Sequence, residues 1–347
     1  MNMKKLNVTL AIFVAAVMAG NAQTNSTNQP VYSDIVGYMK ISIPAGKASL
    51  VSFPLGGAPL TSGVFSGKSG NVLSTSAALN SLPGTLLNSS SEAIYYAEIT
   101  SVINQGRILE IVGKSSASIT VGDSSGISGN ETFVVKKFTT IADVFGAQNS
   151  AGLKGGDGVG NADVVWAVVS GAWKQYFFYD DGNGGEVDPL QWQTIGSFDD
   201  KSDTRIDPEQ GLLIARLPGS NKDVTIVGTV KSTSTIAPMI TGAQIITNPY
   251  PIDKTLGSLG LYTGNVATGL KSGDQVSTAD VVYKLVDGVW KQYFVYDDGN
   301  AGEVDPIQWQ TPGNFADQQN VSVAAGEALL LVRRGQQFEW KPAKPTL

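Results

Sequence analysis

The 347-residue sequence contains neither cysteine nor histidine. Without cysteine the chain can form no disulfide and no thiolate nucleophile, so burial of apolar side chains in a large core must stabilise the fold. Without histidine it can form neither a Ser-His-Asp site nor the usual histidine-containing zinc sites. These absences exclude the most widespread classes of nucleophilic and zinc-dependent enzyme.

Long apolar segments are also scarce. The one pronounced run, from Leu10 to Ala19, is about half of the roughly 20 residues that a membrane-spanning helix needs. Lys4 and Lys5 precede the run, and Gly20-Asn21-Ala22 follows it with small residues suited to a cleavage site. We therefore predict a secretory signal peptide over residues 1–22 and no transmembrane helix after its cleavage. The expected location is the cell envelope, at the periplasm or outer surface, or the extracellular space.

Positive charge is in short supply. Without Lys4 and Lys5, 22 basic residues face 30 acidic ones, which leaves a net charge of −8. Because binding to phosphates needs clustered Lys and Arg, we expect no nucleic-acid partner.

An internal duplication dominates the second half of the sequence. Residues 163–194 and 280–311 are identical at 24 of 32 positions with a constant offset of 117. The match continues at this offset, so the core repeats span 163–216 and 280–333. A weaker match upstream relates 36–40 to 227–231 and 50–54 to 245–249. We therefore predict a first β unit over 23–235, with a β subdomain inserted at about 57–136, and a related second unit over 236–347.

Strand signals are frequent and helical signals are few. Residues 164–169 and 172–179 are β-branched and aromatic runs separated by Ser170-Gly171. The second copy has Asp287-Gly288 at that place, a dipeptide that favours a type I′ hairpin turn. Further strand-like runs occur in the insertion at 93–102, 107–113, 118–121 and 132–138, and helical turns are expected only at 139–145 and 253–261. We predict an all-β fold, mainly of antiparallel sheets, as a β-sandwich or a partly open barrel with few short helical turns.

Each copy contains an acidic, glycine-rich loop, DDGNGGEVD at 180–188 and DDGNAGEVD at 297–305. Calcium takes about six to eight oxygen ligands, so these loops are candidate Ca²⁺ sites. Their candidate ligands are Asp180, Asp181, Asn183, Glu186, Asp188, Asp297, Asp298, Asn300, Glu303 and Asp305. The spacing is not that of an EF-hand, and a polar turn in which an aspartate caps the hairpin is the alternative. No cofactor is required by either interpretation.

Tryptophans recur in both copies. Trp173, Trp192, Trp290 and Trp309 are candidate ligand residues, because aromatic faces beside amides such as Gln175 suit stacking against sugars. Packing in the core is the competing interpretation, since alternation along the strand leaves both faces largely apolar.

Paired carboxylates could also support glycoside hydrolysis, which needs two of them at a suitable separation. Asp181 with Glu186 or Asp188 is the candidate pair. A glycine-rich exposed loop offers little desolvation to raise the pKa of a catalytic acid. We therefore predict no enzymatic activity and assign no catalytic residue.

Short motifs through most of the chain occur in a characteristic order: Val36-Gly37-Tyr38, Pro44-Ala45-Gly46, Val51-Ser52-Phe53-Pro54, Tyr95-Tyr96-Ala97-Glu98-Ile99-Thr100, residues 129–133 and Ala162-Asp163-Val164-Val165-Trp166. In this order they resemble an uncharacterised secreted family abundant in Verrucomicrobia. The resemblance implies export and β structure but no activity, catalytic residue or cofactor.

These features together predict an exported, non-catalytic structural or surface-interaction protein. It would act by assembly with itself or by contact with surface glycans. Assembly is expected because open sheets leave edge strands that can pair with another chain. The alternatives are a calcium-dependent carbohydrate-binding module and a carboxylate-dependent glycoside hydrolase.

Overall fold

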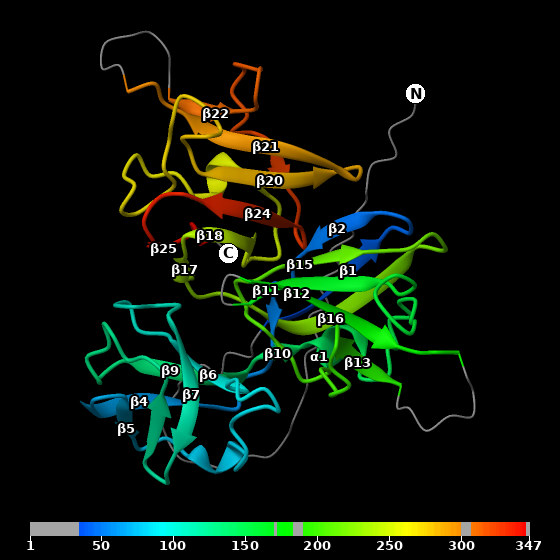
Figure 1. Ribbon diagram of the computed structural model, residues 1–347. Helices are drawn as coiled ribbons and strands as arrows, with labels where there is room; N and C mark the ends of the chain where they lie inside the picture. The colour runs from blue at the N-terminus through cyan, green and yellow to red at the C-terminus, as the bar shows by residue number, and fades with distance from the viewer. Residues whose placement is uncertain (1–34, 170–171, 183–189, 300–306, 345–347) are drawn as a thin grey trace.

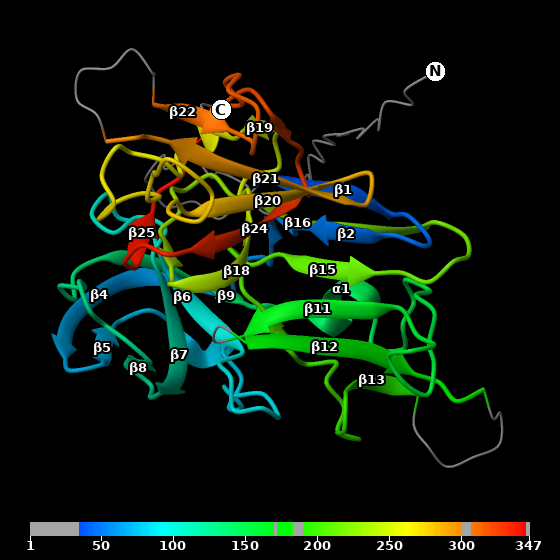
Figure 2. The same ribbon diagram turned by 45° about the horizontal axis from the view of Figure 1, so that its top comes forward.

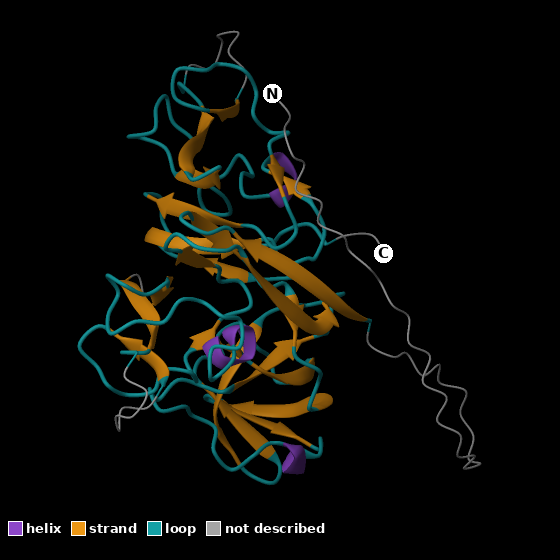
Figure 3. Cartoon of the chain, turned by 90° about the vertical axis from the view of Figure 1, so that its right-hand side faces the viewer, coloured by secondary structure: helices purple, strands orange, loops and turns teal. Residues whose placement is uncertain are grey.

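β-Strands make up most of the regular secondary structure in a computed structural model that describes residues 35–169, 172–182, 190–299 and 307–344. Within these residues the helical segments are short: α1 (Ile141–Phe145) and the 3-10 turns η1 (Leu79–Ser81) and η2 (Gly257–Leu259). Figure 3 shows how strands and loops dominate the chain. The all-β, antiparallel fold class predicted from the sequence is confirmed. α1 and η2 fall inside the two expected helical turns, whereas η1 is a helical turn that the sequence did not predict.

The first copy is built on a five-stranded antiparallel sheet in the order β13-β12-β11-β15-β2. Its strands are β2 (Ala48–Val51), β11 (Val164–Val169), β12 (Ala172–Tyr179), β13 (Gln191–Thr194) and β15 (Leu212–Ala215). A three-stranded sheet, β1-β16-β3, lies against it and consists of β1 (Val36–Ile43), β3 (Leu55–Gly56) and β16 (Lys222–Val230). The short strands β10 (Thr139–Thr140) and β14 (Arg205–Ile206) pair beside α1.

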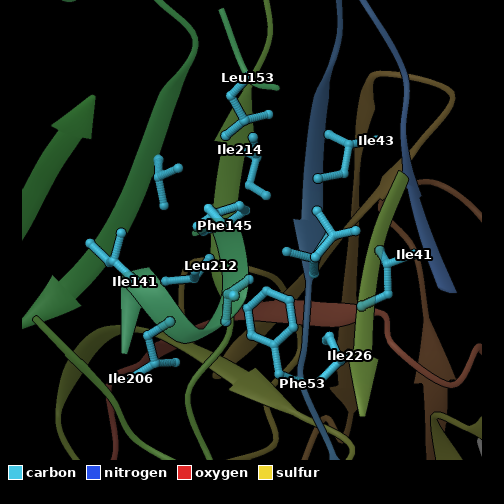
Figure 4. Packing of buried hydrophobic residues seen from close by; sticks show 14 of the residues in the cluster. Ile41, Ile43, Phe53, Ile141, Phe145, Leu153, Ile206, Leu212, Ile214 and Ile226 are labelled. Atoms are coloured by element: carbon cyan, nitrogen blue, oxygen red, sulfur yellow. The ribbon is translucent and has the colours of Figure 1, made fainter. Parts of the chain in front are cut away.

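Helix α1 anchors the core of this first copy. Thr140 and Asp143 form a reciprocal capping box at its start, which satisfies backbone donors that a helix leaves unpaired. The helix is therefore stable although it is short, and it delivers Phe145 into the apolar cluster shown in Figure 4. There Phe145 packs with Phe53 and with aliphatic side chains from both sheets.

The inserted segment forms a closed six-stranded barrel, in the order β4-β5-β8-β7-β6-β9. Its strands are β4 (Thr61–Ser69), β5 (Val72–Thr75), β6 (Tyr95–Ile99), β7 (Ile108–Lys114), β8 (Ser118–Val121) and β9 (Thr132–Lys137). Phe65 and Phe133 stack in its interior with ring centroids 4.2 Å apart. Closure pairs every strand of this module on both sides and so leaves no edge strand within it. Figure 1 shows the barrel as a module of its own, in blue to blue-green, beside the sheets of the repeats.

The second copy repeats the five-stranded sheet, in the order β18-β24-β20-β21-β22. Its strands are β18 (Gly242–Thr247), β20 (Val281–Val286), β21 (Val289–Tyr296), β22 (Gln308–Gln310) and β24 (Ala328–Arg333). Two small pairs complete the unit: β17 (Ala237–Met239) with β25 (Phe338–Trp340), and β19 (Lys254–Thr255) with β23 (Ser322–Val323). Asp287 and Gly288 both have positive φ, 54° and 84°. The type I′ turn predicted for this hairpin is confirmed, whereas Ser170-Gly171 lies outside the described residues.

The two copies pack against each other reciprocally, as the subunits of a symmetric dimer do. Val51 forms an isolated bridge with Glu327, and Gln210 forms one with Ile246. The sequence match makes Val51 the counterpart of Ile246 and Gln210 the counterpart of Glu327. The two bridges are therefore equivalent contacts, related by one pseudo-two-fold axis. Figure 2 shows the two sheets layered, with β18 next to β15 and β11 at the junction.

An apolar cluster built from matched positions fills this junction. It contains Leu50, Val168 and Leu213 of the first copy and their counterparts Ile245, Leu285 and Leu330. The pairing of β1 with β16 obeys the same symmetry, because Gly37 lies directly opposite Gly228, its counterpart in the weak upstream match. Positions that match in sequence therefore contact one another at this junction.

Candidate functional site

A groove of about 590 Å³ lies beside the hairpin of the first copy. It is lined by Ser90, Glu92, Trp166, Trp173, Lys174, Gln175, Tyr176, Thr194, Ile195, Ser197, Lys201 and Thr204. These residues come from the barrel insertion, from β11 and β12, and from β13 with the segment that follows it. The groove thus joins parts of the chain that are far apart in sequence.

Incomplete strand pairing creates this groove. β13 pairs with β12 only at Tyr176, Phe177, Phe178 and Tyr179, although β12 begins at Ala172. Within the described residues, the outer edge of the first half of β12 therefore has no strand beside it. The side chains and backbone there border open space instead of a neighbouring strand.

Two tryptophans form one wall. Trp166 lies opposite Gln175 and Val168 lies opposite Trp173 in the register of β11 and β12, so Trp166 and Trp173 are diagonal neighbours on one face. Their ring centroids are 6.0 Å apart and their planes meet at 81°, the edge-to-face geometry that aromatic pairs favour. Trp173 remains 39% exposed. The wall consequently offers apolar ring surface to whatever occupies the groove.

Polar side chains also line the groove. Gln175 is one of them, although its Oε1 is inaccessible to solvent and has no hydrogen-bond partner among the described residues. Burial and the nearby Glu92 carboxylate raise the pKa of Tyr176 to about 12, against the effect of a hydrogen bond with Thr204. The Tyr176 hydroxyl therefore stays protonated at neutral pH. Lys174, Lys201 and Glu92 add charges of both signs, so the groove is amphipathic.

The barrel supplies the opposite wall through residues 88–92. The backbone N–H of Ser89 donates to Oδ2 of Asp203 at 2.9 Å, and its hydroxyl donates to Oδ1 at 3.0 Å. Asn88 donates to the carbonyl of Asp203 at 3.1 Å and to Oε2 of Glu92 at 3.0 Å. Asp203 thereby fixes the loop that brings Ser90 and Glu92 to the groove.

The four tryptophans proposed from sequence fall into two groups. Trp173 and Trp290 are exposed, by 39% and 41%, whereas Trp192 and Trp309 are buried, with 0% and 5% exposed. Nε1 of Trp192 donates to the carbonyl of Gly146 at 2.9 Å, which ties the indole to the end of α1. Trp192 and Trp309 therefore leave the set of ligand candidates, because a buried indole has no face to offer.

Trp166 is a groove residue that the sequence argument missed. The signal was present, since the predicted hairpin register places it diagonally from Trp173. The contribution of Ser90 and Glu92 had no such signal, because their approach depends on how the barrel docks.

The acidic loops are described only in part. Asn183, Glu186, Asp188, Asn300, Glu303 and Asp305 lie outside the described residues. Oδ1 of Asp180 accepts the N–H of Gly182 at 3.0 Å, and Oδ1 of Asp297 accepts that of Gly299 at 3.0 Å. Each contact is a local turn in which an aspartate oxygen accepts the N–H two residues later. No group of three acidic side chains suited to a metal ion occurs within the described part of the chain.

A second, smaller cavity of about 40 Å³ lies where the barrel meets both repeats. Oε2 of Glu98 is 2.9 Å from Nζ of Lys136, and Oε1 pairs with Lys231. Burial acts to raise the pKa of Glu98, but the two lysines and a hydrogen bond from Thr233 outweigh it and hold this pKa at about 2. Burial raises the pKa of the neighbouring Glu209 to about 8. The small volume and the internal ion pairs suit a structural junction better than a ligand site.

Comparison with models of protein families, with curated proteins and with solved structures yields no match. Along the described ranges, no helix has the length and apolar character needed to cross a membrane. The site must therefore be interpreted from its own geometry.

Proposed function

We propose that this chain is an exported, non-catalytic binding protein that recognises surface glycans through the groove beside β12. The observation that carries the proposal is the edge-to-face pair of half-buried Trp166 and exposed Trp173 in a groove that Lys174 and Gln175 also line. Pyranose rings present apolar C–H faces that pack on indoles and hydroxyls that pair with amides and charged groups. A groove of about 590 Å³ lies within the range of roughly 300–1,000 Å³ typical of small-molecule sites.

Binding without hydrolysis fits the groove better than catalysis does. Glycoside hydrolysis needs two carboxyl groups on either side of the scissile bond. Among the described residues that line the groove, Glu92 alone carries a carboxylate. The signal-like segment over residues 1–22 supports delivery of this binding surface to the cell envelope or the extracellular space.

Calorimetric titration of the mature chain with cellohexaose, mannohexaose and hexagalacturonate tests this proposal. These probes differ in linkage geometry and charge. We expect one of these probes to bind. Trp173→Ala should weaken that binding about tenfold or more, because a tryptophan that a ligand covers often supplies much of the binding energy. Phe198→Ala is the matched control, since Phe198 is an exposed aromatic that does not line the groove. Absence of binding to all three at millimolar concentration, or an unchanged affinity in Trp173→Ala, would overturn the proposal.

A second candidate is self-association through open strand edges. The first half of β12 and the matching part of β21 have no outer strand within the described residues, because β22 pairs only with Phe294, Val295 and Tyr296. Unpaired edges can pair with another chain. Light scattering at high protein concentration distinguishes the candidates, because a monodisperse monomer would contradict assembly but leave glycan binding intact.

A further inference from the structure

The aromatic wall of the groove is repeated in the second copy. Tyr283 and Trp290 occupy the positions of Trp166 and Trp173, with ring centroids 6.2 Å apart and planes at 83°. The corresponding values in the first copy are 6.0 Å and 81°. The geometry is thus maintained although one tryptophan is replaced by tyrosine.

The scaffold beneath this second pair is the same. Tyr283 lies opposite Gln292 and Leu285 lies opposite Trp290, which reproduces the register of Trp166 with Gln175 and of Val168 with Trp173. Lys291 follows Trp290 as Lys174 follows Trp173. An aromatic pair, an amide and a lysine therefore recur together.

Core packing does not account for the position of Trp290. The neighbouring Tyr293, Phe294 and Val295 on the same strand are buried, whereas Trp290 is exposed and belongs to no apolar cluster of the described residues. Leaving a large apolar side chain in water forfeits the stabilisation that its burial would supply. An indole held in this way at matched positions of both copies is better explained by contact with a ligand.

The surroundings of the two pairs differ because the barrel is inserted only in the first copy. Ser90 and Glu92 have no counterpart beside Trp290, and Asn320 stands at the position of Asp203, which anchors their loop. Gln318 replaces Lys201, and Val321 replaces Thr204. Compared with the walled groove, the second pair thus lacks the wall of Ser90 and Glu92 and the hydroxyl of Thr204, and we call it the open platform.

We infer that the Tyr283–Trp290 platform is a second, weaker glycan site, so that one chain binds two segments of the same polysaccharide. The inference rests on the proposed function of the first groove. The apolar junction between the copies holds the two sites at a set separation. When one polymer spans both sites, joining them raises its affinity by about 10²- to 10⁴-fold without any new contact.

The test compares the mature chain with Trp173→Ala, Trp290→Ala and the double variant. Titration with cellohexaose, mannohexaose and hexagalacturonate should give two sites per chain for the probe that binds. Trp290→Ala should leave one site with the affinity of the stronger, and Trp173→Ala should leave the weaker. Binding to the matching polymer, cellulose, mannan or polygalacturonate, should fall about 10²-fold in Trp290→Ala. Phe315→Ala controls for loss of an exposed aromatic in the same copy and should change neither result.

The outcomes separate this inference from the proposed function. One site per chain that Trp173→Ala abolishes and Trp290→Ala leaves intact would overturn the second site while the first stands. Absence of binding to all probes would overturn both. Trp290→Phe keeps an aromatic face and should retain part of the binding at the second site. An unchanged melting temperature of this variant shows that its binding is measured on the folded protein.

Discussion

Nε of Arg216 lies 3.0 Å from Oδ2 of Asp163, and solvent reaches neither side chain appreciably. Arg333 repeats the contact with Asp280 in the second copy, at 2.6 Å. Asp163 immediately precedes β11 and Arg216 immediately follows β15, so the pair ties together two adjacent strands at one end. Asp163 also accepts the backbone N–H groups of Lys154 and Leu217. Each repeat is thus closed by a buried, fully bonded carboxylate.

Arg216→Met should destabilise the protein severely. It leaves the Asp163 carboxylate buried without its cation, and breaking such a pair costs about 3–5 kcal/mol in the free energy of unfolding. Urea unfolding measures the change. Lys40→Met is the control, because it breaks an exposed pair with Asp223, for which about 0–1 kcal/mol is expected. Equal losses in the two variants would contradict a structural role for the buried pair.

Glu209 should make stability fall as the pH rises. Its carboxyl ordinarily loses its proton near pH 4.5, but burial raises its pKa in the folded protein to about 8, with Asp207 and Glu98 acting in the same direction and Lys231 against them. Between these values the unfolded chain is ionised while the folded chain keeps the proton. Folding therefore takes up a proton, and the free energy of unfolding declines through this window by an amount on the order of a few kcal/mol.

Glu209→Gln tests this linkage, because glutamine mimics the protonated acid. We expect the variant to be more stable than the parent at pH 8 and about equal to it at pH 4.5, as measured by urea unfolding across that range. Asp223→Asn, on the surface, serves as control and should leave the slope with pH unchanged between 5 and 8. A slope in Glu209→Gln as steep as that of the parent would rule out Glu209 as its source.

Asp203→Ala should weaken glycan binding at the walled groove and leave the affinity of the open platform unchanged. The substitution removes the two hydrogen bonds between the carboxylate and Ser89, so the wall formed by Ser90 and Glu92 is held less firmly, by the bond from Asn88 to the carbonyl of residue 203. We expect about a tenfold loss at the stronger site, the equivalent of roughly 1.4 kcal/mol, by calorimetry. Asn320→Ala, at the matching position of the second copy, is the control. Equal affinity in Asp203→Ala and the parent would show that the barrel does not contribute to the site.

Gly211→Ala should disturb the junction between the copies. A Cβ at Gly211 would lie 2.4 Å from Cβ of Ala328, its own counterpart, and 2.9 Å from the carbonyl oxygen of Val51. Overpacking of this kind costs about 1–3 kcal/mol in the free energy of unfolding. Gly158→Ala is the control, because a Cβ there meets no atom within 4 Å. If chemical unfolding gave the two variants the same stability, the close approach at the axis would be refuted.

Local signals account for much of the fold. The β-branched runs, the Asp287-Gly288 turn and the capping box at Thr140 operate between neighbours in sequence, and the structure has strands, a type I′ turn and a helix at those places. Trp192 shows where such signals stop. It resembles Trp173 in type and in repetition, yet it is buried against Phe145 and Phe178, and the carbonyl of Gly146, 46 residues earlier, satisfies its N–H. Alternation along a strand distinguishes two faces, but it does not say which of them another element covers.

The sequence by itself determined that the chain is β-rich, duplicated, acidic and without cysteine or histidine, because composition, repetition and turn chemistry are properties of short segments. Only the tertiary structure decided that the copies meet across a pseudo-two-fold axis and that the insertion closes into a barrel. It also decided that Glu92 reaches the groove of Trp173. These outcomes depend on contacts between residues far apart in the chain, and the packing of whole sheets selects them.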